Sequence, residues 1–414
     1  MGKSALGFVG LGLVLSFAGP AFALDVLRAG EDRQVVQKAL EGSKELIAGQ
    51  ADLLDAQGAV AKSRAALGPQ VSLSAGQSFA GQGRTYYGTS GQASLSVSQS
   101  LYNANLTAAR TSSEYKLRSA QLQNQAARQT VAQSAWLSYW GAVVSQKSLQ
   151  VMAQELKDYE RLIAYATEQA QMGLKTNQEL AQLKVAYTRA QLSYDDATRQ
   201  NEEMMRALKD MTGQDWSFAS DLPVEGLSLT EGESHQRRDA AELNLQAARL
   251  SSELTKKANR PQIALGGSVT LATWGKSSRE QGEWSASLNA SLPLGGAGDK
   301  EEQEAAKLRL QEAQKASDKA PGEDQRALEK AKADFERAQA SLNLARESEK
   351  IALEALRLTL VGYDEGLNSQ KDLIDAKQSA SDAQVNLMQA QLALLKSWSA
   401  YYVLLGTFTD QLGL

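Results

Sequence analysis

The sequence predicts a mainly α-helical protein with membrane β-strands, in which a long coiled-coil helical barrel is joined to four strands per chain. Three observations predict this fold class. The chain repeats itself once at an offset of about 192 residues. Each half holds two segments in which apolar and small polar residues alternate. Each half also holds a stretch nearly free of proline that is long enough for roughly 100 Å of helix.

The first residues have the pattern of a secretory signal peptide. Lys3 precedes a short apolar stretch, and Ala21-Phe22-Ala23 fits the small-residue site at which signal peptides are cut. The alternative is a membrane anchor, but the apolar run is shorter than the roughly 20 residues needed to span a bilayer. We therefore predict that residues 1–23 are a signal peptide and that the mature chain is exported.

An internal duplication organises the rest of the chain. Pro69-Gln70-Val71-Ser72-Leu73 returns as Pro261-Gln262-Ile263-Ala264-Leu265, and the segment from Gly173 to Leu180 returns from Gly366 to Leu373. We predict a first repeat over residues 24–212 and a second over residues 236–405, joined by residues 213–235 and followed by a tail, 406–414. The only histidine, His235, lies in the joining segment, where we expect a solvated loop residue.

Each repeat is predicted to hold two strands, at about 70–80 and 91–101 and again at about 262–273 and 283–293. Apolar residues alternate with small uncharged ones, which is the pattern of a strand with one apolar and one polar face, and ten residues can cross a bilayer at a tilt. A soluble sheet with one buried face would alternate in the same way. The small, uncharged second face favours a pore lining, with Leu95 and Leu288 facing lipid and Ser96 facing the pore. Polar, glycine-rich turns are predicted over 81–90 and 275–283.

Four strands are too few to close a barrel, and an open edge in lipid leaves backbone groups unpaired. The chain is therefore predicted to share its barrel with other copies. Two copies would give an eight-stranded barrel, whose interior side chains largely fill, whereas three would give twelve strands and room for water. Strand number favours a homotrimer.

Long helices are predicted over 103–171 and 175–212, and over 300–361 and 367–405, with a break at Pro321-Gly322. In the second helix of each repeat, apolar residues recur at alternating steps of three and four, which is the pattern of a coiled-coil seam. We interpret this stripe as packing. The length of the helices predicts that they extend the pore far into an aqueous compartment.

Composition excludes several kinds of function. The chain has 414 residues, 44 basic and 48 acidic side chains, a formal charge of −4, one histidine and no cysteine. Mixed charges argue against nucleic acid as a partner. The absence of cysteine excludes disulfides, thiolate catalysis and cysteine-based metal sites. No G-x-S-x-G elbow and no phosphate-binding loop occurs, so we predict no enzyme, no catalytic residues, no metal and no other cofactor.

The order of elements in each repeat resembles that of the TolC family of outer-membrane efflux proteins, over essentially the whole mature chain. The strand lengths and the two Gly-Leu turns carry the resemblance, and Gly362-Tyr363-Asp364-Glu365-Gly366 looks like the family's second periplasmic tip. The resemblance implies a trimeric, 12-stranded transmembrane β-barrel in the lipid of the outer membrane and a helical tunnel across the periplasm. It also implies two partners, a periplasmic adaptor (membrane fusion) protein and an inner-membrane pump of the RND or ABC type.

The resemblance also implies the site residues. Asp372 and Asp375 match the acids that line the narrow entrance of the tunnel, Tyr363 matches a gate tyrosine, and Gln178 and Glu179 match its partner region. The tips that dock the adaptor would contain Gly173, Leu174, Gly366 and Leu367.

Two points at this site stay open. Asn368 stands where the family has a gate arginine, so that ion-pair lock should be absent or replaced. The two aspartates could instead be helix N-terminal acids favoured by the helix dipole.

The predicted function is a passive exit duct of a tripartite efflux or type I secretion system, in the outer membrane and extending into the periplasm. The alternative is a coiled-coil structural or adhesive protein of the cell surface without transport activity. The cargo is not encoded in any motif of the chain.

Overall fold

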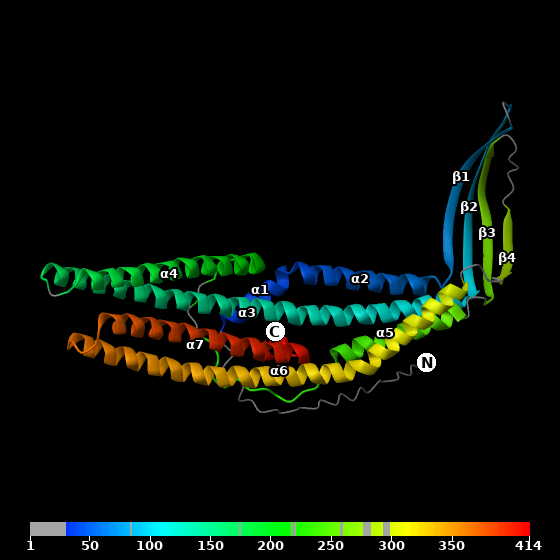
Figure 1. Cartoon of the computed structure of the whole chain (residues 1–414). Coiled ribbons are helices and arrows are strands. Elements are labelled where there is room, and N and C mark those ends of the chain that lie inside the picture. The colour runs from blue at the N-terminus through cyan, green and yellow to red at the C-terminus, as the bar shows by residue number, and fades with distance from the viewer. Residues whose placement is uncertain are drawn as a thin grey trace, which may run out of the picture.

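The computed structural model describes residues 30–82, 85–173, 175–216, 218, 221–256, 260–275, 283–292 and 299–414. The predicted signal peptide, 1–23, lies outside the described residues. Figure 1 shows an elongated molecule with a curved four-stranded sheet at one end and two helical hairpins, α3–α4 and α6–α7, whose turns lie at the other end. The elements are, in chain order, α1 (Glu31–Gly42), α2 (Lys44–Ala65), β1 (Gln70–Gln82), β2 (Thr85–Tyr102), α3 (Ala104–Gln171), α4 (Asn177–Thr212), α5 (Gln236–Lys256), β3 (Gln262–Gly275), β4 (Trp284–Ser291), α6 (Asp299–Asp364), α7 (Gln370–Leu405) and α8 (Phe408–Leu412).

The strands form one antiparallel sheet in the order β1-β2-β3-β4, so the two repeats meet at the β2–β3 pair. The register places like residues opposite one another across all four strands. One row consists of Leu73, Leu95, Val269 and Trp284, and the adjacent row on the other face consists of Ser72, Ser96, Ser268 and Ser285. At this level of the sheet, one face therefore presents apolar side chains and the other presents small hydroxyl side chains.

The first hairpin is longer than the sequence predicts. Residues 81–90 are predicted as a polar turn, but β1 continues to Gln82 and β2 begins at Thr85, with Gln82 paired to Thr85. A register shift between Ala80 and Gly81 interrupts the ladder. Backbone hydrogen bonds do not depend on apolar side chains, so polar residues can pair once the strands are aligned.

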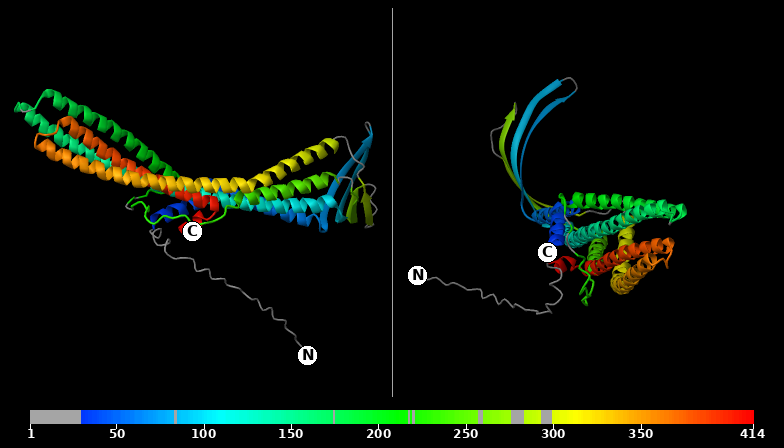
Figure 2. Two further views of the ribbon diagram at one scale, coloured as in Figure 1. Left: turned by 60° about the horizontal axis from the view of Figure 1, so that its bottom comes forward. Right: turned by 90° about the vertical axis from the view of Figure 1, so that its left-hand side faces the viewer.

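The helix α6 also differs from the sequence prediction, because it continues through Pro321, where a break is predicted. Proline inside a helix removes one backbone hydrogen bond and costs about 3 kcal/mol. Packing of α6 against α5 opposes this cost, and the neighbouring Ala320 and Asp324 are each only 4% exposed. The Asp324 carboxylate accepts a hydrogen bond from the backbone N–H of Arg238 in α5, at 3.2 Å. Figure 2 shows α6 bent along its length, as an internal proline commonly causes.

The main core lies midway along the molecule, where α1, α8 and the joining segment pack against the middle of α3 and the end of α7. Trp136 and Trp398 pack at 5.7 Å between ring centroids. The Trp136 Nε1–H donates to the carboxylate of Asp32 at 3.2 Å, and burial raises the pKa of Asp32.

His235, in the joining segment, is exposed and lies 3.7 Å from Glu233. None of the described helices combines the length and apolar composition required to cross a membrane.

Candidate functional site

The two hairpin turns at the end opposite the sheet are built alike. Gly173 (φ +73°) follows α3 and Gly366 (φ +75°) follows α6, each in the left-handed conformation that ends a helix without steric cost only for glycine. Leu367 is exposed, with 77% of its surface accessible, whereas Leu174 lies outside the described residues.

Capping boxes begin the two returning helices. In the first turn, the Glu179 carboxylate accepts hydrogen bonds from the Thr176 backbone N–H at 2.8 Å and hydroxyl at 3.0 Å, and Thr176 Oγ1 accepts from the Glu179 N–H at 3.2 Å. In the second turn, Asp372 and Ser369 make the same three bonds at 2.9, 2.7 and 3.2 Å. These bonds lower the pKa values of Glu179 and Asp372, through the Thr176 backbone and the Ser369 hydroxyl respectively. Within one chain, both acids therefore start helices.

The structure links the two turns through a residue that the sequence analysis did not select. The Lys175 ammonium donates a hydrogen bond to the Tyr363 hydroxyl and lies 4.4 Å from the centroid of its ring. It also lies 3.4 Å from Gln370 Oε1, and the Gln370 amide donates to the backbone oxygen of Glu179. Burial lowers the pKa of Lys175. Tyr363 and the Glu179 turn, both selected from the sequence, are thus brought together by Lys175 and Gln370.

Asn368, which stands in the position of the familiar arginine, bonds within its own turn. Its amide donates to the Thr359 carbonyl at 3.3 Å. At the repeat offset of 193 residues, Lys175 is the residue equivalent to Asn368. The cation that contacts Tyr363 is therefore supplied by the first repeat, and the internal alignment is the signal that could have found it.

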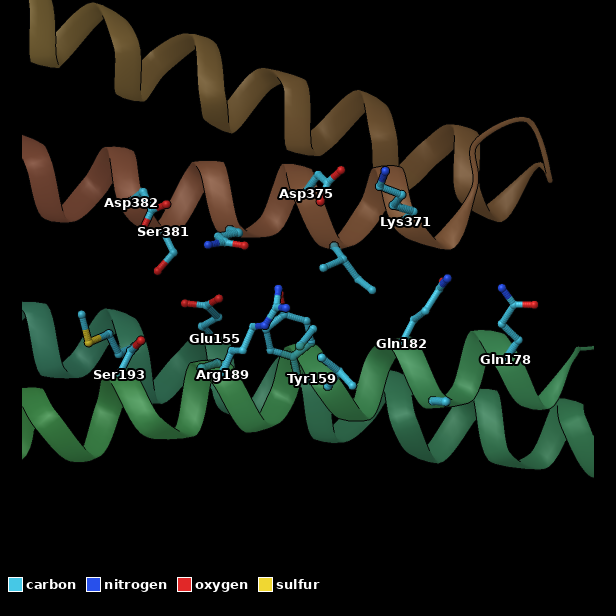
Figure 3. A pocket seen from close by; sticks show the side chains of 17 residues that line it. Glu155, Tyr159, Gln178, Gln182, Arg189, Ser193, Lys371, Asp375, Ser381 and Asp382 are labelled. Carbon is cyan, nitrogen blue, oxygen red and sulfur yellow. The ribbon is translucent and has the colours of Figure 1, made fainter.

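A cavity of about 580 Å³ lies behind the turns, between α3, α4 and α7. Figure 3 shows Gln178 and Gln182 from α4 and Asp375 and Lys371 from α7 around it, with Glu155 and Tyr159 on the α3 side. Gln178 and Asp375, both selected from the sequence, therefore line one cavity.

Acidic side chains line the cavity on the α3 and α7 sides, and Arg189 and Lys371 also line it. Burial raises the pKa of Tyr159 to about 12, and the carboxylates of Glu155, Asp375 and Asp382 contribute to that shift. The pKa of Glu155 is itself raised, chiefly by burial, although a hydrogen bond with Ser381 opposes the shift.

An ion pair joins the hairpins beside this cavity. The Lys377 ammonium of α7 lies 3.0 Å from the Asp158 carboxylate of α3, and the Lys377 side chain is only 10% exposed. Among the described residues, no group of three or more metal-ligating side chains is arranged to hold an ion. The site is thus a set of polar contacts between two hairpins, suited to holding them together or releasing them.

The fold is shared with solved outer-membrane channels. The channel CmeC of Campylobacter jejuni superposes with a TM-score of 0.81 at 18% identity, covering 91% of this chain and 86% of that one. VceC of Vibrio cholerae gives a TM-score of 0.74 at 17% identity over 91% and 96% of the two chains. The open state of the Neisseria gonorrhoeae channel MtrE gives 0.76 at 20% identity over 91% and 88%.

The described residues therefore have the fold of outer-membrane channels. The sequence profile of the family described as outer membrane efflux protein matches residues 35–214 and 234–407. The chain belongs to the outer membrane efflux protein family, a family of channel proteins, which confirms the predicted resemblance. A comparison with curated protein sequences gave no match.

Proposed function

We propose that three copies of this chain form a passive duct through the outer membrane, which receives cargo at the helical tips and releases it through a shared twelve-stranded barrel. The observation that carries this proposal is the pair of rows on the sheet, Leu73-Leu95-Val269-Trp284 on one face and Ser72-Ser96-Ser268-Ser285 on the other. The first face suits lipid and the second suits water. Among the described strands, β1 and β4 lie at the two edges of the sheet, so neighbouring copies can pair there.

The helical end supports the second part of the proposal. We propose that the turns containing Gly173, Leu174, Gly366 and Leu367 dock a periplasmic adaptor, which connects the duct to an inner-membrane pump of the RND or ABC type. The exposed Leu367 offers an apolar contact to such a partner. Cargo would be chosen by the pump, and the duct itself would perform no chemistry, whether in drug efflux or type I secretion.

The proposed gate consists of Gln178, Glu179, Tyr363, Asp372 and Asp375. In a trimer, the two aspartates of each copy would form a ring that attracts cations. Replacing Asp372 and Asp375 with Ala should weaken the block of single-channel current by multivalent cations. Unchanged block would remove these residues from the gate.

Extraction and conductance test the whole proposal. The chain should require detergent to leave the outer membrane, purify as a trimer and give steady ion currents in a planar bilayer. A filament or monomer that is soluble without detergent and carries no current would support the surface-protein alternative and overturn the duct.

A further inference from the structure

The cavity between α3, α4 and α7 has the size of a site for a small organic molecule. Its volume of about 580 Å³ lies within the range of roughly 300–1,000 Å³ that is usual for ligand pockets. On α4 its lining runs from Gln178 to Ser193, which is about 22 Å of helix. The space is therefore elongated along the helices and can hold an elongated ligand.

Apolar side chains from all three helices line much of this space. They are Met152 on α3, Val185 and Ala186 on α4, and Ile374 on α7. Val185 keeps 52% of its surface accessible, although it lines the cavity. A ligand that covers these side chains removes apolar surface from water, which is favourable. This part of the lining suits the apolar body of a ligand.

The α3 wall holds a buried polar group that has no partner. Tyr159 lines the cavity, and Figure 3 shows its ring reaching from α3 into the space between α4 and α7. Only 2% of the residue is exposed, and among the described residues its hydroxyl makes no hydrogen bond. A buried hydroxyl without a partner costs free energy, so a ligand that bonds to it gains affinity.

Carboxylates from both hairpins surround this hydroxyl. Glu155 lies one turn before Tyr159 on α3, and Asp382 lies on α7; both raise the pKa of Tyr159. Asp382 also raises the pKa of Glu155, although burial is the larger cause of that shift. Negative charge from α3 and α7 thus converges on one part of the cavity.

The cations nearby leave these acids without a partner of opposite charge. Lys377 lowers the pKa of Glu155, but its ammonium is paired with Asp158 at 3.0 Å. Arg189 and Lys371 line the cavity, yet both are exposed and neither contributes to the pKa shift of Glu155. Among the described residues, neither of them forms an ion pair. The acids beside Tyr159 therefore favour a cation that a ligand supplies.

We propose that this cavity binds an amphipathic organic amine, whose protonated nitrogen lies between Glu155 and Asp382 beside the Tyr159 hydroxyl. The ammonium donates hydrogen bonds to the carboxylates and to the phenol oxygen, and the apolar body lies against Val185 and Ile374. Because Glu155 belongs to α3 and Asp382 to α7, the bound amine connects the two hairpins and holds the tips closed. Its effect on current rests on the proposed duct, whereas binding itself requires only one chain.

Calorimetric titration of the full chain in a non-ionic detergent tests the site. The probe is phenethylamine, and phenethyl alcohol is a neutral control of nearly the same size. The amine should bind at least about tenfold more tightly, because a hydrogen bond to a charged group contributes about tenfold or more to affinity. Equal affinities for the amine and the alcohol, or no binding of the amine, would overturn the proposal.

Matched variants locate the amine. Glu155→Gln and Asp382→Asn keep the size of each side chain and remove its charge, so each should weaken amine binding about tenfold and leave the alcohol unchanged. Tyr159→Phe removes only the hydroxyl and should weaken it about threefold. The control Glu168→Gln changes an exposed acid of α3 that does not line the cavity, and it should have no effect. Affinity that survives both Glu155→Gln and Asp382→Asn overturns the site.

Currents separate the site from the duct. Phenethylamine should lower the open probability of the parent in planar bilayers but not that of Glu155→Gln. Block that persists in Glu155→Gln places the amine elsewhere, as at a ring of aspartates, and overturns the connection of the hairpins. A chain that binds the amine as expected but carries no current overturns the duct and keeps the site.

Discussion

At the scale of single residues, Glu179 and Asp372 complete the capping boxes of their helices and are also residues of the proposed gate. Each carboxylate is held by the threonine or serine that begins its helix, so the geometry of the turn depends on it. Asp375 has no such bond and lines the cavity. A change at Asp372 therefore alters both local folding and charge, whereas a change at Asp375 alters mainly charge.

The contact between Lys175 and Tyr363 is predicted to hold the two turns together. A cation over an aromatic ring at a partly exposed site contributes about 0.5–1 kcal/mol. Lys175→Ala should therefore raise the ratio of open to closed channels by about two- to five-fold, measured as open probability in planar bilayers. Lys116→Ala, on an exposed part of α3, should leave open probability unchanged. A Lys175→Ala channel that gates like the parent would show that the contact does not restrain the tips.

Glu155 gives a prediction that depends on pH. Burial raises its pKa in the folded chain, so the folded state favours the protonated acid. The stability that it contributes is present below the ordinary glutamate pKa and is lost as pH rises through the raised value. Glu155→Gln should therefore raise the melting temperature at neutral pH, and the gain should vanish in acid below about pH 4.3.

The matched control is Glu168→Gln, an exposed position on the same helix, which should change the melting temperature little at either pH. A Glu155→Gln variant that gains as much in acid as at neutrality would mean that packing, rather than ionisation, causes the effect.

At the scale of elements, the alternation of apolar and polar residues predicts the strands, and the apolar residues at steps of three and four predict the helices. Both patterns depend only on local geometry. The departures have tertiary causes. The helix continues through Pro321, where α6 packs against α5 and Asp324 accepts a hydrogen bond from Arg238. The hairpin extends beyond Ala80 because two aligned backbones continue to pair. The contact of Lys175 with Tyr363 joins residues 188 apart, and no local pattern encodes it.

The sheet faces predict different responses to charge. Leu95 lies on the apolar row and Ser96 on the serine row, where its hydroxyl is 2.7 Å from that of Ser72. Leu95→Arg, or the same change at Leu288, should impair assembly in the membrane, with a cost of about 2–4 kcal/mol at mid-bilayer. Ser96→Arg should be tolerated. Trimer yield from purified outer membranes would measure both, and equal losses would reverse the assignment of faces.

At the scale of the whole molecule, the duplication is visible as equivalent architecture. α4 and α7 each contain 36 residues and begin and end 193 residues apart. Left-handed glycines end both, Gly213 at φ +76° and Gly406 at φ +74°. Two similar units in one chain, with open edges on opposite margins, can propagate around a ring. The number of copies that closes it follows from the curvature of the assembled sheet, which four strands alone do not determine.

The number of copies in the proposed ring can be determined by mixing two forms of the chain. We expect that co-expression of the parent with a form extended at its partly exposed C-terminus, Leu414, gives assemblies that native mass spectrometry can separate by mass. Because each copy would make the same two contacts, both forms should enter the ring at random. Three copies would then give four species, with zero to three extended chains. Three species would indicate a dimer whose eight strands leave little lumen, and five would indicate a tetramer. Either result would contradict the trimer. If the only two masses are those of the single parent and single extended chains, the copies do not associate at all.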